Sequence, residues 1–446
     1  MRTALSLALV SAIALALGKG TALIAKVILA RTFSDADYGL FNVFLSLTSM
    51  LSIVAVIGLP KGVVGYYPRL ATKTDAQALR GMVFYPPAAV VAASVIIAGT
   101  YQVLMQLGFA IDFQLQPKHW LIVAWTLPAQ ALILLFGHLL LASGRSTSYV
   151  VSSQLLFNGL FLVGVALLAW KEGQSLDALL NLYAFFSWVV VLLLAAWCLW
   201  VMKLDGWLDA WAAKLPPGEF WRYSFTLLLS MLCYVALGNV DRLMLIGWVR
   251  AGDVADYSVA FTVAATLPLM LLLVDAYLTP KLSSAFAAAA VEDAVGFYQR
   301  CNRLLALGAS IVVVLFVVFA KPLLSLFDET YIRAESLLLI LLLGEYINVL
   351  FGTSGRMLQL GGAQSREAQL VAVMVAFNVG LNFLLIPAYG VLGAVWATCL
   401  TRVLHALAKS WQIYLKWGAT AWGEHWLWVS AVCCGTCTLL LVSTLA

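Results

Sequence analysis

Long apolar stretches separated by short polar gaps repeat along the whole chain. A helix that crosses a membrane needs about 20 mainly apolar residues. Thirteen stretches meet this length, and the gaps between them are too short to hold a soluble catalytic domain. The pattern predicts an all-α polytopic membrane protein with helices over residues 4–30, 38–59, 82–107, 119–142, 148–170 and 178–202, then 221–249, 256–279, 302–320, 334–355, 367–387 and 390–415, and finally 424–445.

The first twelve of these stretches form two similar halves. The segment K-V-I-L-A-R-T-F-S-D-A-D-Y-G-L-F-N-V-F-L (26–45) predicts the end of one helix, a polar turn over Arg31 to Asp37, and a new helix from Tyr38. A related turn, V-R-A-G-D-V-A-D-Y-S-V-A-F (249–261), follows half a chain later. The matches that keep an offset of 219 or 220 residues are Asp37-Tyr38 with Asp256-Tyr257, Pro60-Lys61 with Pro280-Lys281, Arg80 with Arg300, and Phe157-Asn158 with Phe377-Asn378. Such an internal duplication is typical of secondary transporters.

Each half contains six predicted helices, and this even number gives both halves the same orientation in the membrane. We therefore expect two six-helix bundles related by a pseudo-two-fold axis along the membrane normal, with a cavity between them. The link from Lys203 to Glu219 separates the halves, because Pro216-Pro217-Gly218 interrupts the helical pattern. This predicts an N-terminal lobe over residues 1–214, a C-terminal lobe over 215–417, and one additional transmembrane helix within 418–446.

The composition agrees with a membrane protein and excludes a soluble one. Hydrophobic residues make up 63% of the chain and charged residues only 11%, with a mean hydropathy of +0.97. A soluble surface needs more charge than this. The net charge of +5 does not indicate nucleic-acid binding, because the basic residues lie in the short gaps between apolar stretches and not in one patch.

The basic residues predict the orientation of the chain. With the N-terminus inside, the inside gaps hold sixteen Lys and Arg residues and the outside gaps hold six. Because these residues accumulate on the cytoplasmic side, we expect a multi-pass protein of the cell inner (cytoplasmic) membrane with a cytoplasmic N-terminus. Two inside gaps, Tyr66 to Arg80 and Lys281 to Arg300, are long enough to hold a short interfacial helix each. The first apolar run continues to Ala30, so we expect a retained helix and not a cleaved signal peptide.

Two lysines in the first helix are candidate substrate-binding residues. An ionisable side chain near the bilayer centre costs about 2.5–3.5 kcal/mol, so each one is a candidate functional group. Lys19 and Lys26 lie seven residues apart and therefore project from one helix face. We expect their ammonium groups to bind an anion such as phosphate. Snorkelling to the membrane surface is the alternative for Lys26, which lies about one turn from the outer end of its helix.

The predicted seventh helix carries two adjacent charges. Asp241 and Arg242 point about 100° apart on a helix, so they cannot face the same partner. Arg242 is a candidate third cation for the substrate, and Asp241 is a candidate counter-ion or coupling residue. A structural ion pair between the two bundles is the alternative for both.

Further ionisable residues lie within predicted helices of the second half. Glu345 lies near mid-membrane and could take up and release a proton during transport, or it could be a neutral acid hydrogen-bonded to a neighbour. Asp275 lies near the cytoplasmic end of its helix, as a counter-ion or as a hydrated boundary residue. Arg402 shares a helix face with His405 and has no exit to either membrane surface, which predicts a substrate-binding or inter-helix role. Three asparagines are expected to hydrogen-bond between helices: Asn158, Asn378 and Asn382.

The sequence lacks the signatures of common enzymes. It contains no G-x-S-x-G, Walker A or H-E-x-x-H motif and no metal-ligand cluster. We therefore expect a transporter, with no cofactor and no metal. A membrane glycan polymerase or ligase is an alternative, although such an enzyme needs a long external loop with paired acids.

Two segments resemble a known family. The first is A-R-T-F-S-D-A-D-Y-G-L-F-N-V (30–43), followed by I-G-L-P-K-G-V-V (57–64), and it resembles the opening of the polysaccharide-exporting branch of the MOP flippase superfamily. The second, N-V-D-R-L-M-L-I-G (239–247) followed by D-Y-S-V-A (256–260), looks like the start of that family's second half. Members usually have twelve or fourteen helices, so the thirteenth predicted here departs from the family pattern.

The resemblance implies a V-shaped, MATE-like transporter of two six-helix lobes. Such a flippase moves an undecaprenyl-pyrophosphate-linked oligosaccharide, for example an O-antigen unit, to the periplasmic leaflet for polysaccharide biosynthesis. Cationic residues of these flippases engage the pyrophosphate, which would give Lys19, Lys26 and Arg242 a role. The implied partners are the lipid-linked glycan and the bilayer, with a polymerase and glycosyltransferases as candidate partners, no nucleic acid, and a monomeric state.

A cation-coupled multidrug antiporter on the same fold is the main rival. Such an antiporter needs an acidic cavity for organic cations. The candidate residues named above comprise four basic ones and three acidic ones, which favours an anionic substrate mildly.

Overall fold

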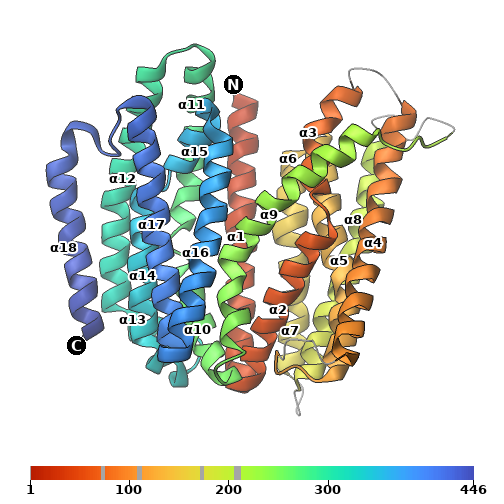
Figure 1. Cartoon of the computed structure of the whole chain (residues 1–446), viewed down its shortest axis with the longest axis horizontal. Helices are drawn as coiled ribbons and strands as arrows, with labels where there is room; N and C mark the ends of the chain where they lie inside the picture. The colour runs from red at the N-terminus through yellow and green to blue at the C-terminus, as the bar shows by residue number, and fades with distance from the viewer. Residues whose placement is uncertain (1, 72–75, 108–112, 171–174, 205–211, 446) are drawn as a thin grey trace. The chain divides into compact units, whose positions relative to one another are not determined.

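The computed structural model describes residues 2–71, 76–107, 113–170, 175–204 and 212–445 (Figure 1). All regular secondary structure in these ranges is helical. Twelve segments of the described chain are long and apolar enough to cross a membrane, judged by length and composition. Each of the thirteen predicted helices overlaps one of them, because the segment Glu329–Tyr389 contains two predicted helices, 334–355 and 367–387. The structure therefore confirms an all-helical membrane protein.

The chain divides into two compact units, one ending at Asn239 and the other beginning at Val240. The division falls inside one long helix, α9 (Gly218–Leu245), so that this helix starts in the first unit and ends in the second. The boundary expected at residue 214 lies before this helix, in the first unit.

The first unit is built around α5, which packs against five other α-helices, α2, α3, α4, α6 and α8. The helix α1 packs against α7 and the π-helical segment η1. The elements of this unit, besides the start of α9, are α1 (Arg2–Thr32), α2 (Asp35–Ala55), α3 (Leu59–Ala71), α4 (Ala76–Gln106), α5 (Pro117–Ala142), α6 (Ser146–Val150), η1 (Val151–Leu156), α7 (Phe157–Ala169) and α8 (Leu176–Leu204).

The turn after α1 is shorter than the predicted turn over Arg31 to Asp37. Helix α1 continues to Thr32, and α2 begins at Asp35. The reason is a helix cap, since the Ser34 hydroxyl accepts a hydrogen bond from the backbone N–H of Asp37 at 3.2 Å. The acidic side chains of the first turn also favour this helix end, where the helix dipole is positive.

A sharp break separates α2 from α3. Ile57 and Gly58 both have positive φ angles, +50° and +72°. A glycine is required at the second position, because a Cβ on Gly58 would lie 1.9 Å from the carbonyl oxygen of Ser224 in α9. The break therefore lets α3 approach the first half of α9 at backbone distance.

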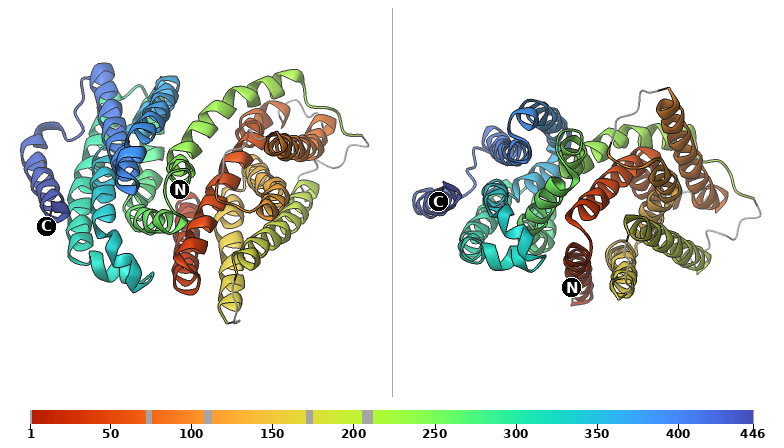
Figure 2. Two further views of the ribbon diagram at one scale, coloured as in Figure 1. Left: turned by 60° about the horizontal axis from the view of Figure 1, so that its bottom comes forward. Right: turned by 90° about the horizontal axis from the view of Figure 1, so that it is seen from below.

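The second unit is organised around α14 and α17, which pack against each other along their lengths. Its elements, besides the end of α9, are α10 (Ala251–Ala264), α11 (Leu269–Ala287), α12 (Val291–Val318), α13 (Ala320–Ser325), η2 (Glu329–Ala334), α14 (Glu335–Leu350), α15 (Ser354–Leu358), η3 (Gln359–Ala363), α16 (Gln364–Tyr389), α17 (Val391–Trp417), η4 (Gly423–His425) and α18 (Trp426–Leu445). The additional helix, α18, lies at the rim of this unit, against α12 and α14 (Figure 2).

Of the two polar segments expected to hold an interfacial helix, the one described in full, Lys281 to Arg300, does not hold a separate helix. In the segment Lys281 to Arg300, α11 continues to Ala287 and α12 starts at Val291, so no separate helix lies between them. In the segment Tyr66 to Arg80, α3 ends at Ala71 and α4 is helical from Ala76, and residues 72–75 lie outside the described residues. The membrane helices simply extend beyond their apolar cores, since the polar residues at their ends are also good helix formers.

Candidate functional site

Lys19 is an exposed side chain on α1 in the first unit. The neighbouring Gly18 is docked on η1 and α7, because a Cβ there would lie 2.7 Å from the carbonyl oxygen of Gln154. The side-chain amide of Asn158 donates to the Gly18 carbonyl at 3.1 Å, which confirms the predicted inter-helix role of this asparagine. Lys19 itself forms no hydrogen bond or ion pair with any residue that the structure describes. Its charge is therefore available to a ligand.

Lys26 lies two turns further along α1 and is half-buried. The spacing of seven residues places it on the same helix face as Lys19. The first unit thus carries both predicted substrate-binding lysines on one stripe of one helix.

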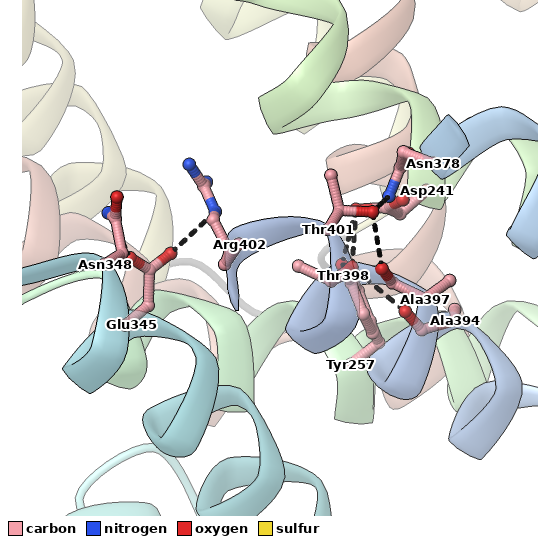
Figure 3. A network of polar contacts seen from close by, with 10 residues as sticks. All are labelled: Asp241, Tyr257, Glu345, Asn348, Asn378, Ala394, Ala397, Thr398, Thr401 and Arg402. Atoms are coloured by element: carbon pink, nitrogen blue, oxygen red, sulfur yellow. Dashed lines mark hydrogen bonds and ion pairs between the residues drawn. The ribbon is translucent and has the colours of Figure 1, made fainter. Parts of the chain in front are cut away.

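Asp241 lies near the end of α9 and is buried in the second unit, 2% exposed. Two hydroxyl groups, which Figure 3 shows, and one amide group contact its carboxylate. Tyr257 Oη of α10 and Thr398 Oγ1 of α17 each lie 2.9 Å from Asp241 Oδ2, and Asn382 Nδ2 of α16 donates to Oδ1 at 2.6 Å. These contacts offset the cost of burying the charge. They also confirm the expected inter-helix hydrogen bond of Asn382.

The network around Asp241 extends along α16 and α17. Asn382 Nδ2 also donates to Asn378 Oδ1 at 3.1 Å, and Asn378 Nδ2 lies 3.4 Å from Thr401 Oγ1. Thr398 Oγ1 lies 2.9 Å from the Ala394 carbonyl as well as from Asp241. Because this hydroxyl has one proton, it can donate to only one of these two oxygens at a time.

The Asp241 cluster has the chemistry of a site for a small monovalent cation. It gathers one carboxylate and several neutral oxygens, and hard cations prefer oxygen ligands of this kind. Asn382 Oδ1 is buried and has no hydrogen-bond partner within the described chain, so it is available as a ligand. A transition-metal site is not indicated, since the described residues contain no group of three or more His, Cys, Asp or Glu side chains placed to hold a metal.

Arg242 is also buried, 6% exposed, and faces α10. Its Nε donates to Ser258 Oγ at 3.2 Å, and its guanidinium lies 4.6 Å from the ring centre of Phe261. The two adjacent charges share one neighbour, since the Tyr257 hydroxyl bonds Asp241 while the Arg242 guanidinium lies 5.8 Å from the centre of the Tyr257 ring; their other contacts differ. The structure places this candidate substrate-binding residue in the interior of the second unit.

Glu345 and Arg402 form a buried ion pair between α14 and α17. Glu345 Oε1 lies 3.1 Å from Arg402 Nε, and Asn348 Nδ2 donates to Glu345 Oε2 at 3.1 Å. The helices come together at Gly344, where a Cβ would lie 2.8 Å from the Cα of Cys399. Figure 3 shows the two polar groups on opposite sides of α17, with Asp241 on one side and Glu345 on the other. The candidate counter-ion and the candidate substrate-binding arginine are thus partners of each other.

Asp275 forms an ion pair at one end of the second unit. Its Oδ2 accepts from Arg356 Nε of α15 at 2.9 Å, and the Asp275 side chain is 21% exposed. This partly solvated pair fits the expected boundary position.

Lys409 is a buried charge that the sequence analysis did not identify as a candidate. The orientation count includes Lys409 among the sixteen inside charges, although it falls in the predicted helix 390–415; in the structure it lies within α17 and is 7% exposed. One turn earlier, His405 is 8% exposed, and its Nε2 has no hydrogen-bond partner in the described part of the chain. The signal that could have found Lys409 is its spacing from Arg402 and His405, which repeats at seven and four residues on one helix face.

Comparisons with known proteins support the architecture. The MatE family model matches residues 227–406, which run from α9 into α17. A multidrug resistance MATE family transporter of the MOP superfamily, in an inward-facing conformation, is 16% identical with a TM-score of 0.71, and the match covers 95% of this chain and 98% of that structure. The lipid II flippase MurJ is 13% identical with a TM-score of 0.72, covering 98% of both chains. No curated protein matches the sequence.

Both of these solved structures are of transporters, one described as a multidrug resistance protein and the other as a lipid flippase. The TM-scores of 0.71 and 0.72 establish the shared architecture. The sequence identities, below one fifth, leave the substrate open. The chain therefore has the fold that MATE transporters share with the lipid II flippase MurJ.

Proposed function

We propose that the chain is a flippase that moves an undecaprenyl-pyrophosphate-linked oligosaccharide across the cytoplasmic membrane for the synthesis of a cell-surface polysaccharide. The fold shared with a lipid flippase supports transport of a lipid-linked substrate. The motif A-R-T-F-S-D-A-D-Y-G-L-F-N-V supports the polysaccharide-exporting branch. The polar headgroup would pass through the protein while the polyprenyl tail stays in lipid.

This proposal rests on a difference between the charged residues of the membrane helices: the acidic residues have partners within the described chain, and Lys19 does not. Each of the three acidic residues is engaged inside the second unit, Asp241 by hydroxyl and amide groups, Glu345 by Arg402, and Asp275 by Arg356. Lys19 in the first unit has no partner among the described residues. A positive charge at membrane depth without a counter-ion costs several kcal/mol (~2.5–3.5), and an anionic substrate group such as a pyrophosphate would offset that cost.

A cation-coupled multidrug antiporter is the second candidate function. The match of residues 227–406 to the MatE family favours it. An organic cation would need an acidic side chain that is not already engaged, and the three in-span acids all have partners. We therefore rank this function below the flippase.

The coupling ion is part of the same proposal. The oxygen cluster at Asp241 would bind a monovalent cation such as Na⁺, and Glu345 would exchange a proton. Either event changes the charge within the second unit during a transport cycle.

The test is export of the glycan in cells that depend on this chain. The variant Lys19→Ala/Lys26→Ala should abolish export and leave the lipid-linked precursor on the cytoplasmic face, as measured by surface-polysaccharide labelling and precursor extraction. Lys321→Ala is the matched control, because this lysine is 63% exposed and lies outside the candidate site.

Other outcomes point to the rival functions. Normal export combined with lost drug resistance in the double variant would support the multidrug antiporter and contradict the flippase. Accumulation of short repeats that have already crossed the membrane would support a glycan polymerase or ligase.

A further inference from the structure

A stripe of buried (His405, Lys409) and partly buried (Arg402, Gln412) polar side chains follows one face of α17 beyond the Glu345–Arg402 pair. Its members are Arg402, His405, Lys409 and Gln412, spaced by three, four and three residues, which is the spacing of a single helix face. The ten residue steps from Arg402 to Gln412 span about 15 Å at 1.5 Å per step. This is about half of the ~30 Å hydrocarbon thickness.

Three members of the stripe lack direct partners in the described protein. His405 Nε2 and Gln412 Oε1 are buried without a hydrogen bond. The ammonium of Lys409 has no hydrogen bond or ion pair within the described residues, although its side chain is buried. Buried polar groups are almost always satisfied by protein or by ordered water, because leaving one unpaired costs free energy. Three such groups on consecutive turns indicate a continuous line of water molecules.

The groups that face Lys409 from the surrounding helices balance its charge at a distance. They are Glu345 from α14, Glu367 from α16 and Asp275 from α11, with Arg402 on α17 itself and Arg356 of α15 bound to Asp275. Three cations and three anions therefore share this part of the second unit. The net charge of this group is zero without a bound anion. The polar stripe can therefore conduct a proton and need not bind a counter-ion.

More polar groups line the same interior. Tyr298 Oη of α12 lies 3.0 Å from Ser354 Oγ, and Thr353 Oγ1 donates to Asn302 Oδ1 at 2.6 Å. Asn302 Nδ2 is buried without a partner in the described chain. An interior this polar is unusual for a helical bundle that is otherwise packed with leucine, valine and alanine, and it points to hydration.

We infer that this stripe is a hydrated proton path that connects Glu345 to the end of the second unit where α11 ends and α12 begins. A proton enters from water at that end, near Glu367, and passes through the waters at Lys409 to His405. His405 Nε2 takes up a proton and the imidazole releases one toward Glu345. The carboxylate of Glu345 becomes a neutral carboxyl, so that its ionic attraction to Arg402 is lost while Arg402 keeps its charge. The reverse sequence returns the proton.

This inference deepens the proposed function, because it assumes that Glu345 exchanges its proton during transport. His405 and Lys409 are positioning residues here, since they act on the rate at which the proton reaches Glu345. Their role can be measured without the glycan substrate, so failure of the path and failure of the flippase proposal give different results.

The experiment is infrared spectroscopy of the full chain reconstituted in liposomes. The carbonyl stretch of protonated Glu345, identified by its loss in Glu345→Gln, is followed after a switch from H₂O to D₂O. The variant His405→Leu/Lys409→Met should slow deuterium exchange at Glu345 by about tenfold or more, because a relay of positioned groups is removed. Lys416→Met is the control with unchanged exchange, since this residue lies on the same helix but is exposed and bonds the Gly361 carbonyl.

Gln412→Leu provides a second variant if the double variant does not fold, and it should also slow the exchange. Equal exchange rates in wild type and in these variants would overturn the inference. So would the absence of any Glu345 band from mildly acidic to mildly alkaline pH. A shift of the Glu345 carbonyl band on addition of chloride or phosphate would likewise overturn the inference, because it would indicate an anion site at Lys409.

Discussion

The buried pair Glu345–Arg402 leads to a quantitative prediction. Removing one partner of a buried ion pair costs about 3–5 kcal/mol, because the other charge stays buried and unpaired. The Arg402 side chain is 24% exposed and the Glu345 side chain 6% exposed, so water can hydrate part of the arginine when Glu345 is neutral. We therefore expect Glu345→Gln or Arg402→Met to lower the free energy of unfolding by about 3 kcal/mol each, at the low end of that range.

The double variant Glu345→Gln/Arg402→Met should cost less than the two single variants together, by about 2 kcal/mol, since it removes both charges of the pair. The assay is SDS-titrated unfolding in bicelles, followed by tryptophan fluorescence, for all four members of the cycle. The exposed pair Lys321–Glu335, 3.5 Å apart, is the matched control and should show a coupling of less than about 1 kcal/mol. Additive single-variant effects for Glu345 and Arg402 would refute the reasoning.

Three further predictions concern the fold and the cation cluster. Gly58→Ala should lower the free energy of unfolding by more than about 2 kcal/mol, because of the clash with Ser224 and the positive φ. Gly99→Ala, where an added Cβ meets nothing within 4 Å, should be nearly neutral in the same unfolding assay, and equal effects of the two variants would contradict the prediction. NaCl should raise the thermal unfolding temperature above that in choline chloride, and Asp241→Asn should remove the difference; a shift that persists in the variant would exclude this site. Ser34→Ala should cost about 0.5–2 kcal/mol through loss of the α2 cap, and no measurable loss would show that the cap is dispensable.

The sequence was sufficient for the positions of the membrane helices, because burial in lipid demands long apolar runs that can be counted directly. It also located the individual charges at Asp241, Glu345 and Arg402. The turn at Ser34 was predicted too long, although Ser34 followed three residues later by Asp37 is a recognisable capping pattern. The helix ends were thus harder to place than the helices themselves.

The partners of the charges could not be predicted from the sequence. Glu345 and Arg402 meet because α14 and α17 approach closely at Gly344, which is a fact of tertiary packing. Lys409 lies close to the end of an apolar run, so the sequence around it suggested a solvated side chain. The face of α17 that packs against α14 determines whether Lys409 is buried. This packing depends on residues far away in the sequence.

The most direct test of the central claim is flipping of the substrate in a purified system. The chain is reconstituted in liposomes that contain a fluorescent undecaprenyl-pyrophosphate-linked oligosaccharide, and a membrane-impermeant quencher reports the fraction left in the outer leaflet. The account predicts transfer between leaflets that exceeds that of protein-free vesicles and is lost in Lys19→Ala/Lys26→Ala. Equal transfer by the wild type and this variant, or transfer of an organic cation in place of the lipid-linked glycan, would contradict it.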